Sequence, residues 1–265
     1  MISSLLYDLN HAPIWRRELS VWNQRMRAPS LDRLVFLGLH RAGLMGAEEA
    51  RLLEKLIEPG MQILDIGANI GLYTLLLARL AGKIGRVFAF EPEPNLFSIL
   101  CENCAANDAT NITPFQCAAG DTNRRAKFQR ATFNSGDNRL GESKRDTQSI
   151  EVEVSRIDEV LSAHIVQFIK LDVQGHELAA LNGMEQILAS SPEVCVLFEF
   201  WPIGLRAAGA SPEALFSFFR ERGFLIYEME RERPRQLEAP TQLVERLGAN
   251  GYTNLLATRI PLVRP

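Results

Sequence analysis

Residues 63–71 read ILDIGANIG, and this stretch decides the fold. An apolar run stops there at a turn with two glycines, and helix-like spacing of apolar residues resumes at Leu72. Glycine permits the backbone angles of a tight turn and lets a ligand approach the main chain, while a helix start carries unpaired N–H donors. The pattern therefore predicts a strand, a tight turn and a helix that together bind a nucleotide-like ligand.

The spacing of the glycines distinguishes two classes of nucleotide site. A dinucleotide fingerprint has the form G-x-G-x-x-G, whereas Gly67 and Gly71 enclose no middle glycine. Asp65 precedes the turn, and Glu91 follows the next apolar run. Two carboxylates at strand ends would repel a phosphate but would accept hydrogen bonds from ribose hydroxyls or an amino group. A nicotinamide-dependent oxidoreductase is the competing enzyme class, and titration with each cofactor would separate the two.

The order of elements along the chain predicts an α/β fold with a seven-stranded, mostly parallel sheet and helices on both faces. The expected strands are 62–66, 86–90, 112–117, 164–171, 194–200, 224–227 and 252–257. The expected helices between them include 70–81, 94–106 and 212–222. The last two strands can form an antiparallel hairpin, and the charged stretch 228–233 is expected to be a surface connection.

Two segments lie outside this alternation. Residues 1–58 have mostly helical spacing and are expected to form an N-terminal helical extension that packs on the sheet or covers the site, leaving 59–265 as the main domain. Within that domain, 122–150 is polar and charged, which predicts an insertion containing a hairpin. Its basic residues, Arg139 among them, would face solvent or meet an anionic substrate.

Composition excludes several classes of protein. A formal net charge of -3 argues against a dedicated nucleic-acid binder, which would carry a basic surplus. The sequence has no apolar run of about 18 residues and no basic leader, so no membrane association and a cytoplasmic location are expected. The four cysteines fall in helix-like or apolar runs typical of reduced thiols, and the pair Cys101 and Cys104 lacks the partners of a zinc site.

Residues 170–177, which read KLDVQGHE, form the second informative block. Lys170 and Asp172 are two apart at the end of an expected strand, so their side chains would point the same way into one pocket. A helix with apolar residues on one face follows. The block therefore predicts a set of ionisable side chains at the rim of the sheet.

This block resembles the K-x-D-V-E-G-x-E signature of the FkbM family of methyltransferases. The stretch 65–71, with FEP at 90–92, is similar to that family's cofactor motifs, and the likeness covers roughly residues 60–200. It implies the class I methyltransferase, Rossmann-like fold. One departure is Gln174, which stands where the family usually has glutamate. An essential base or metal ligand would be lost there, whereas a residue that only bonds neighbouring backbone groups can be glutamine.

The resemblance implies S-adenosylmethionine as the cofactor and S-adenosylhomocysteine as its product. Glu91 would hold the ribose, Asp121 would lie near the adenine, and the turn 67–71 would face the methionine portion. The expected cofactor-binding residues are Asp65, Gly67, Ala68, Asn69, Gly71, Glu91, Pro92, Asp121 and Asp172.

Methyl transfer to a hydroxyl requires alignment of the acceptor and removal of its proton. Asp172, His176 and Glu199 are candidates for the base, and Lys170 would pair with Asp172 or stabilise the developing oxyanion. The expected acceptor is a small molecule, a sugar or natural product with a free hydroxyl. No metal ligand set is predicted, although a metal at Asp172 and nearby acids stays open to a test with a chelator. A cofactor-binding domain without turnover is the non-enzymatic alternative, and a homodimer is left open.

Overall fold

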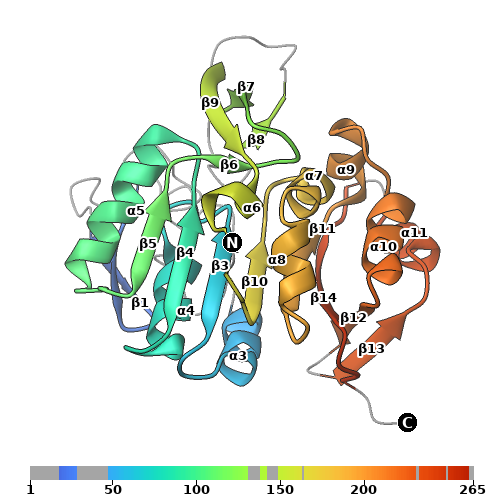
Figure 1. The fold of residues 1–265 in the computed structure, drawn as a ribbon, viewed down its shortest axis with the longest axis horizontal. Coiled ribbons are helices and arrows are strands. Elements are labelled where there is room, and N and C mark those ends of the chain that lie inside the picture. Colours follow the sequence, from blue (N-terminus) through green and yellow to red (C-terminus); the bar gives the residue numbers. More distant parts are fainter. Residues whose placement is uncertain are drawn as a thin grey trace, which may run out of the picture.

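The computed structural model describes residues 18–28, 47–130, 138–141, 149–162, 164–230, 233–248 and 250–262. Its main feature is a sheet of strand order β13-β12-β14-β11-β10-β3-β4-β5 (Figure 1). The strands are β3 (Gln62–Ile66), β4 (Arg86–Phe90), β5 (Ile112–Phe115), β10 (Phe168–Leu171), β11 (Cys195–Phe200), β12 (Leu225–Glu230), β13 (Arg233–Leu237) and β14 (Thr253–Thr258). The five strands from β5 to β11 are parallel, and the remaining pairings are antiparallel.

The sheet has eight strands, one more than predicted. The extra strand is β13, which pairs with β12 as an antiparallel hairpin and includes part of the stretch expected to be a surface connection. Charged residues suit this position because an edge strand has one solvated side. Arg235 of this edge strand pairs with the buried Glu228 of β12, which also pairs with Arg246. Residues 228–230 belong to β12 and Arg233 to β13, so the prediction of a surface connection was wrong for these residues.

Helices cover both faces of the sheet, as predicted, because alternate strand residues point to opposite sides. Ile63 and Phe168 pack on the face covered by α3 (Ala47–Leu56) and α4 (Leu72–Ala81). Leu64 and Ile169 belong to the larger cluster on the other face. The elements that supply or border that cluster are α6 (Ile157–Val160), α7 (Glu177–Asn182), α8 (Glu185–Ser190), α9 (Pro202–Ala207), α10 (Pro212–Glu221) and α11 (Thr241–Leu247).

A second sheet lies at one end of the large one, at the top of Figure 1. Its strand order is β6-β9-β7-β8. The strands are β6 (Ala118–Ala119), β7 (Arg124–Gln129), β8 (Arg139–Leu140) and β9 (Ser149–Ser155). The described residues of the expected insertion thus belong to a small sheet with its own apolar centre, while the bounds of the insertion stay a prediction.

The N-terminal extension contains both a hairpin and a helix among its described residues. The helix α3 matches the expectation, but Glu18–Val21 (β1) and Gln24–Arg27 (β2) form an antiparallel hairpin, so a helix there was the wrong prediction. This hairpin packs on α5 (Pro94–Ala106), where the amide of Asn103 bonds to the backbone of Arg27. The helical spacing at 29–46 lies outside the described residues, and the division at residue 58 stays a prediction. Across the described ranges, no helix has the length and apolar character needed to cross a membrane.

Candidate active site

The turn after β3 uses its own N–H groups to join strands. Gly67 and Ala68 donate to the carbonyl of Phe90 at 3.0 and 2.9 Å, and Asn69 donates to the Glu91 carboxylate at 2.9 Å. Ile70 N–H bonds to the Asn69 side chain, and Gly71 N–H bonds to Ala68 O. The expectation of free N–H donors for a ligand was therefore wrong for residues 67–71. Without such donors the turn makes a poor cradle for a pyrophosphate.

Gly67 is required by a close approach between two strand ends. Its φ is +90°, and a Cβ built on it would lie 1.9 Å from the carbonyl oxygen of Asp172. No side chain fits at that distance, so glycine is what allows the end of β3 to meet the end of β10. The two sequence blocks that carried the prediction are thus in direct contact.

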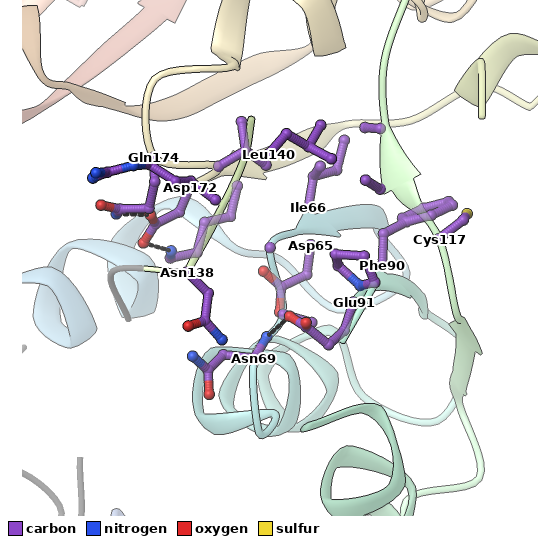
Figure 2. A pocket seen from close by; sticks show the side chains of 18 of the residues that line it. Asp65, Ile66, Asn69, Phe90, Glu91, Cys117, Asn138, Leu140, Asp172 and Gln174 are labelled. Carbon is purple, nitrogen blue, oxygen red and sulfur yellow. Dashed lines mark hydrogen bonds and ion pairs between the residues drawn. The ribbon is translucent and has the colours of Figure 1, made fainter. Parts of the chain in front are cut away.

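Glu91 is a buried carboxyl group in the wall of a pocket (Figure 2). Its oxygens accept the N–H groups of Asn69 and Glu93, at 2.9 and 2.8 Å. Burial raises the pKa of Glu91 to about 8, despite those two hydrogen bonds. A buried acid of this kind is stabilised in its charged form by additional donors, and a pair of ribose hydroxyls would supply them.

Asp65 lines the same pocket and also anchors α4. Its carboxylate accepts the hydroxyl of Thr74 at 2.5 Å, and burial raises its pKa. The side chain therefore fixes the helix behind the turn as well as facing the pocket. Replacing Asp65 would therefore affect both the position of α4 and the lining of the pocket.

The pocket lies between the ends of the central strands and the small sheet. Its floor comes from residues 65–70 and from the ends of β4 and β10, and its roof includes Phe128, Asn138, Arg139 and Leu140. Figure 2 shows Asn138 and Leu140 above the turn that carries Asn69. Part of the 122–150 excursion therefore lines the pocket.

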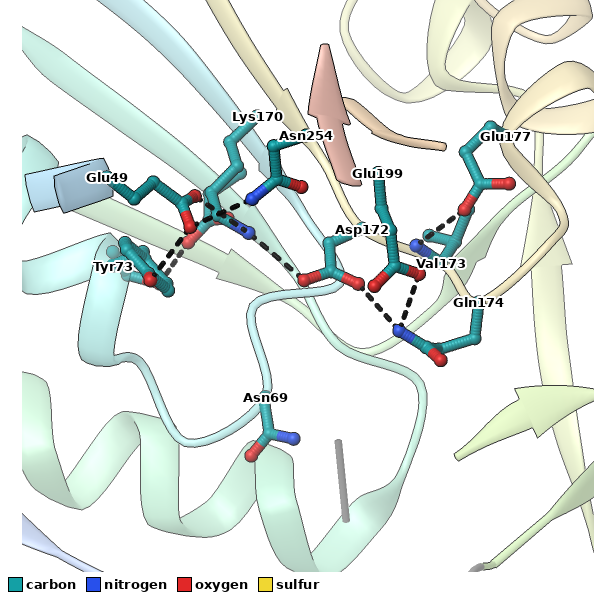
Figure 3. Close-up of polar contacts among 12 residues, drawn as sticks. Glu49, Asn69, Tyr73, Lys170, Asp172, Val173, Gln174, Glu177, Glu199 and Asn254 are labelled. Atoms are coloured by element: carbon teal, nitrogen blue, oxygen red, sulfur yellow. Dashed lines mark hydrogen bonds and ion pairs between the residues drawn. The ribbon is translucent and has the colours of Figure 1, made fainter. Parts of the chain in front are cut away.

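Lys170 is the centre of a polar cluster beside the pocket (Figure 3). Its ammonium group lies 3.2 Å from Asp172, 4.0 Å from Glu49 and over the ring of Tyr73. Burial lowers the pKa of Lys170, but the carboxylates of Asp172 and Glu49 outweigh this effect and raise it. Glu49 in turn accepts the hydroxyl of Tyr73 and the amide of Asn254, at 3.0 and 3.1 Å. The pairing of Lys170 with Asp172, expected from their spacing, is confirmed.

Gln174 joins two carboxyl groups. Its amide nitrogen donates to Asp172 at 3.0 Å and to Glu199 at 2.8 Å. Burial, followed by the nearby charge of Asp172, raises the pKa of Glu199 to about 9. Glu199 is therefore protonated at neutral pH, and Asp172 is the better candidate for a base. Glutamine at this position supplies a donor where a glutamate would add a third acid.

Replacing Gln174 with glutamate is expected to make stability strongly dependent on pH. The variant loses both amide donors and places a new carboxyl group among acids, so the pKa of that group will be higher in the folded than in the unfolded chain. Its destabilising effect will then grow as pH rises from the unfolded pKa to the folded one and stay constant above it. We expect a loss of about 2–4 kcal/mol at pH 8.5 and a much smaller loss at pH 5, measured by urea unfolding. Gln242→Glu, on the exposed face of α11, is the control. Equal losses at both pH values would contradict the bridging role of Gln174.

Three other predicted site residues differ in their position relative to the pocket. Asp121 is exposed and does not line it, because the chain leaves the large sheet after β5 and enters the small one at Ala118. Its assignment to the adenine stays a prediction. Gly71 has φ +89° and lies behind the turn rather than in the lining. Pro92 lines the pocket beside Glu91.

His176 bonds to a backbone carbonyl and does not line the pocket. Its Nε2 lies 3.0 Å from the carbonyl oxygen of Leu140, which can only accept, so Nε2 carries the proton. Burial lowers the pKa of His176, so the ring is neutral at pH 7. The residue ties β8 to the start of α7 and is a weaker candidate for the base than Asp172.

Sequence reasoning missed Glu49, Tyr73 and Asn254, which complete the cluster around Lys170. Glu49 and Asn254 are 205 residues apart. Charged and polar residues on an amphipathic helix and on a strand carry no local signal of a shared site. Only the folded sheet brings them together.

The carboxyl groups of the pocket fit an adenosyl sulfonium. Asp65, Glu91 and Asp172 face or border it, while its turn N–H groups already have acceptors. Hydroxyl and ammonium donors of a ligand complement such acids, whereas a dinucleotide phosphate would meet carboxylates and no free turn donor. Among the described residues, no group of three or more His, Cys, Asp or Glu side chains is arranged to hold a metal.

Comparisons with known proteins agree with this chemistry. A model of the methyltransferase FkbM domain matches residues 65–226. Methyltransferase sdnD of Sordaria araneosa is 25% identical over 157 residues, covering 47% of this chain and 60% of that protein. Hexuronic acid methyltransferase AglP of Haloferax volcanii is 30% identical over 144 residues, covering 53% and 56%. The chain thus spans less than two thirds of either relative.

Among solved structures, the S-adenosylmethionine-dependent O-methyltransferase of Thermotoga maritima has 16% sequence identity and a TM-score of 0.46, covering 91% of this chain and 75% of that chain. The family match is the stronger finding, since it spans more than half of the chain and includes both the Gly-turn block and the Lys170–Glu177 block. The chain therefore belongs to the FkbM methyltransferase family, with S-adenosylmethionine as its cofactor.

Proposed function

We propose that this protein transfers a methyl group from S-adenosylmethionine to a hydroxyl of a small-molecule acceptor, a sugar or a natural product. The observation that carries the proposal is the position of Asp172, which borders the cofactor pocket and is held between Lys170 and Gln174. The sugar acid in the name of the Haloferax volcanii relative supports a sugar-like acceptor.

The cofactor supplies an electrophilic methyl group on a positively charged sulfur. The chain's own contribution is to hold the adenosyl end at Glu91, to align the acceptor, and to exclude water with apolar roof residues such as Phe128 and Leu140. Asp172 Oδ2 or Oδ1 would accept the hydroxyl proton as the oxygen attacks. Lys170, 3.2 Å away, would keep this carboxylate in place and offset the negative charge nearby.

Gln174 does not argue for an inactive domain. Its amide fills the space between Asp172 and Glu199 with two hydrogen bonds, so the site is polar and satisfied at that point. Transfer of labelled methyl from S-adenosylmethionine into a small-molecule extract of the source cells tests the proposal. A labelled product, lost in Asp172→Asn, supports it. Cofactor binding with no labelled product from any extract would favour the domain without turnover.

Cofactor binding is expected to release a proton near neutral pH. Glu91, with a pKa of about 8 in the free protein, is mostly protonated at pH 7, and ribose hydroxyls that donate to it favour its charged form. Affinity for S-adenosylhomocysteine should therefore rise with pH between about 6 and 8. Calorimetric titration in two buffers of different ionisation enthalpy measures the release directly. Equal heats in both buffers would place the ligand away from Glu91.

A further inference from the structure

Trp201 forms a fixed aromatic platform next to the proposed acceptor position. The residue follows β11 and precedes α9. A Cβ on Gly204 would lie 2.0 Å from the indole ring, and a Cβ on Gly175 would lie 2.4 Å from the backbone of Gly204. Two glycines therefore let the loop after β10, the helix α9 and the indole pack in direct contact. This packing leaves the ring little freedom to move.

Arg139 lies over this platform. Its guanidinium carbon is 5.7 Å from the centroid of the Trp201 ring, within the range of a cation–π contact. Arg139 also lines the pocket, as do its neighbours Asn138 and Leu140. The bond from His176 to Leu140 O holds the strand in place from the other side. The guanidinium is thus presented by a braced strand.

This cation has no carboxylate partner within the ranges that the structure describes. Lys170 pairs with Asp172, and Arg130, which follows β7, pairs with Glu93 at 3.0 Å. Arg139 forms no ion pair with any residue that the structure describes. A cation–π contact with an indole does not use the N–H donors of the guanidinium, and their geometry matches a carboxylate or phosphate.

Position assigns this cation to the acceptor rather than to the cofactor. The strand order β11-β10-β3-β4 places the end of β11, which carries Trp201, three strands away from the end of β4, which carries Glu91. At a strand spacing of roughly 4.8 Å this is about 14 Å. Asp172, at the end of β10, lies between the two. A ligand anchored at Glu91 would direct its methyl toward Asp172 and its acceptor toward Arg139.

We infer that Arg139, in cation–π contact with Trp201, binds an anionic group of the methyl acceptor, so that the substrate is a hydroxylated acid or phosphate and not a neutral molecule. This inference rests on the proposed function and names the substrate class for the same site. A neutral acceptor would leave the guanidinium unmatched beside the reaction. An anion bound there would fix the acceptor at one end, while Asp172 meets the hydroxyl at the other.

Saturation-transfer NMR on the protein saturated with S-adenosylhomocysteine tests the inference, with glucuronate, glucose 6-phosphate and glucose as probes. We expect transfer to at least one of the two anions and not to glucose, and the choice between them identifies carboxylate or phosphate. Arg139→Gln should weaken that binding by about tenfold or more, and Arg139→Lys should weaken it less. Arg125→Gln is the matched control, since its side chain is 77% exposed on β7 and lies outside the pocket lining.

Three results would overturn the inference. These results are equal transfer to glucose, no transfer to either anion, and anion binding that Arg139→Gln leaves unchanged. Arg139→Gln should also leave the affinity for S-adenosylhomocysteine within about twofold, because a tenfold loss would assign Arg139 to the cofactor's carboxylate. Failure of the wild-type protein to bind S-adenosylhomocysteine would instead refute the proposed function itself.

Discussion

Glu91→Ala is expected to weaken binding of S-adenosylhomocysteine by about 2–4 kcal/mol, roughly 30- to 800-fold. The substitution removes the carboxyl group that would accept the ribose hydroxyls. It also leaves the N–H groups of Asn69 and Glu93 without their acceptor, so the turn will lose its present shape. The loss of affinity therefore has two sources, the missing contact with the ribose hydroxyls and the changed shape of the turn.

Titration calorimetry measures this loss, and two further variants separate its sources. Glu102→Ala, on the surface of α5, should leave the affinity unchanged. Glu91→Gln keeps one acceptor oxygen and should retain most of the stability while still binding the ligand at least tenfold more weakly. Unchanged affinity in Glu91→Ala would remove this residue from the cofactor site.

Asp172→Asn is expected to lower turnover by about 10²- to 10⁴-fold while changing the affinity for S-adenosylhomocysteine by no more than about threefold. Asparagine has nearly the same size but does not accept a proton at neutral pH. Asp172 contacts both Gln174 and Lys170, and the variant loses the ion pair with Lys170 because asparagine is uncharged. Rates of labelled-methyl transfer, measured with an acceptor-containing extract, give the turnover.

The matched control for this variant is Glu199→Gln. Glu199 is protonated at neutral pH, so an amide resembles its resting form and should keep at least about a third of the turnover. Full activity of Asp172→Asn would exclude this residue as the base. A large loss in Glu199→Gln, with little change in Asp172→Asn, would move the role to Glu199.

The parts of the fold set by local periodicity were predictable. Strands β3 and β4 and helix α5 have the expected bounds, because apolar runs ending at glycine or proline define them in the sequence. The contact of Lys170 with Asp172 followed from the two-residue repeat of a strand. These features depend on near neighbours in the chain.

The parts set by long-range contacts were not predictable. Asp121 follows an apolar run that looks continuous from 112 to 119, yet β5 ends at Phe115 and Ala118 pairs with Val154 in another sheet. The hairpin at 18–27 depends on Asn103, 76 residues away from Arg27. The N–H groups of the turn found acceptors on β4 and within the turn itself, which the glycine pattern alone does not specify.

The central claim is that the pocket formed by the turn 67–71, Glu91 and Asp172 binds an adenosyl sulfonium. Calorimetric titration of the unmodified chain with S-adenosylhomocysteine, and separately with NAD, tests it most directly. The account predicts one site per chain for S-adenosylhomocysteine, with heat that depends on the buffer at pH 7, and no heat with NAD. Heat with NAD and none with S-adenosylhomocysteine would contradict it.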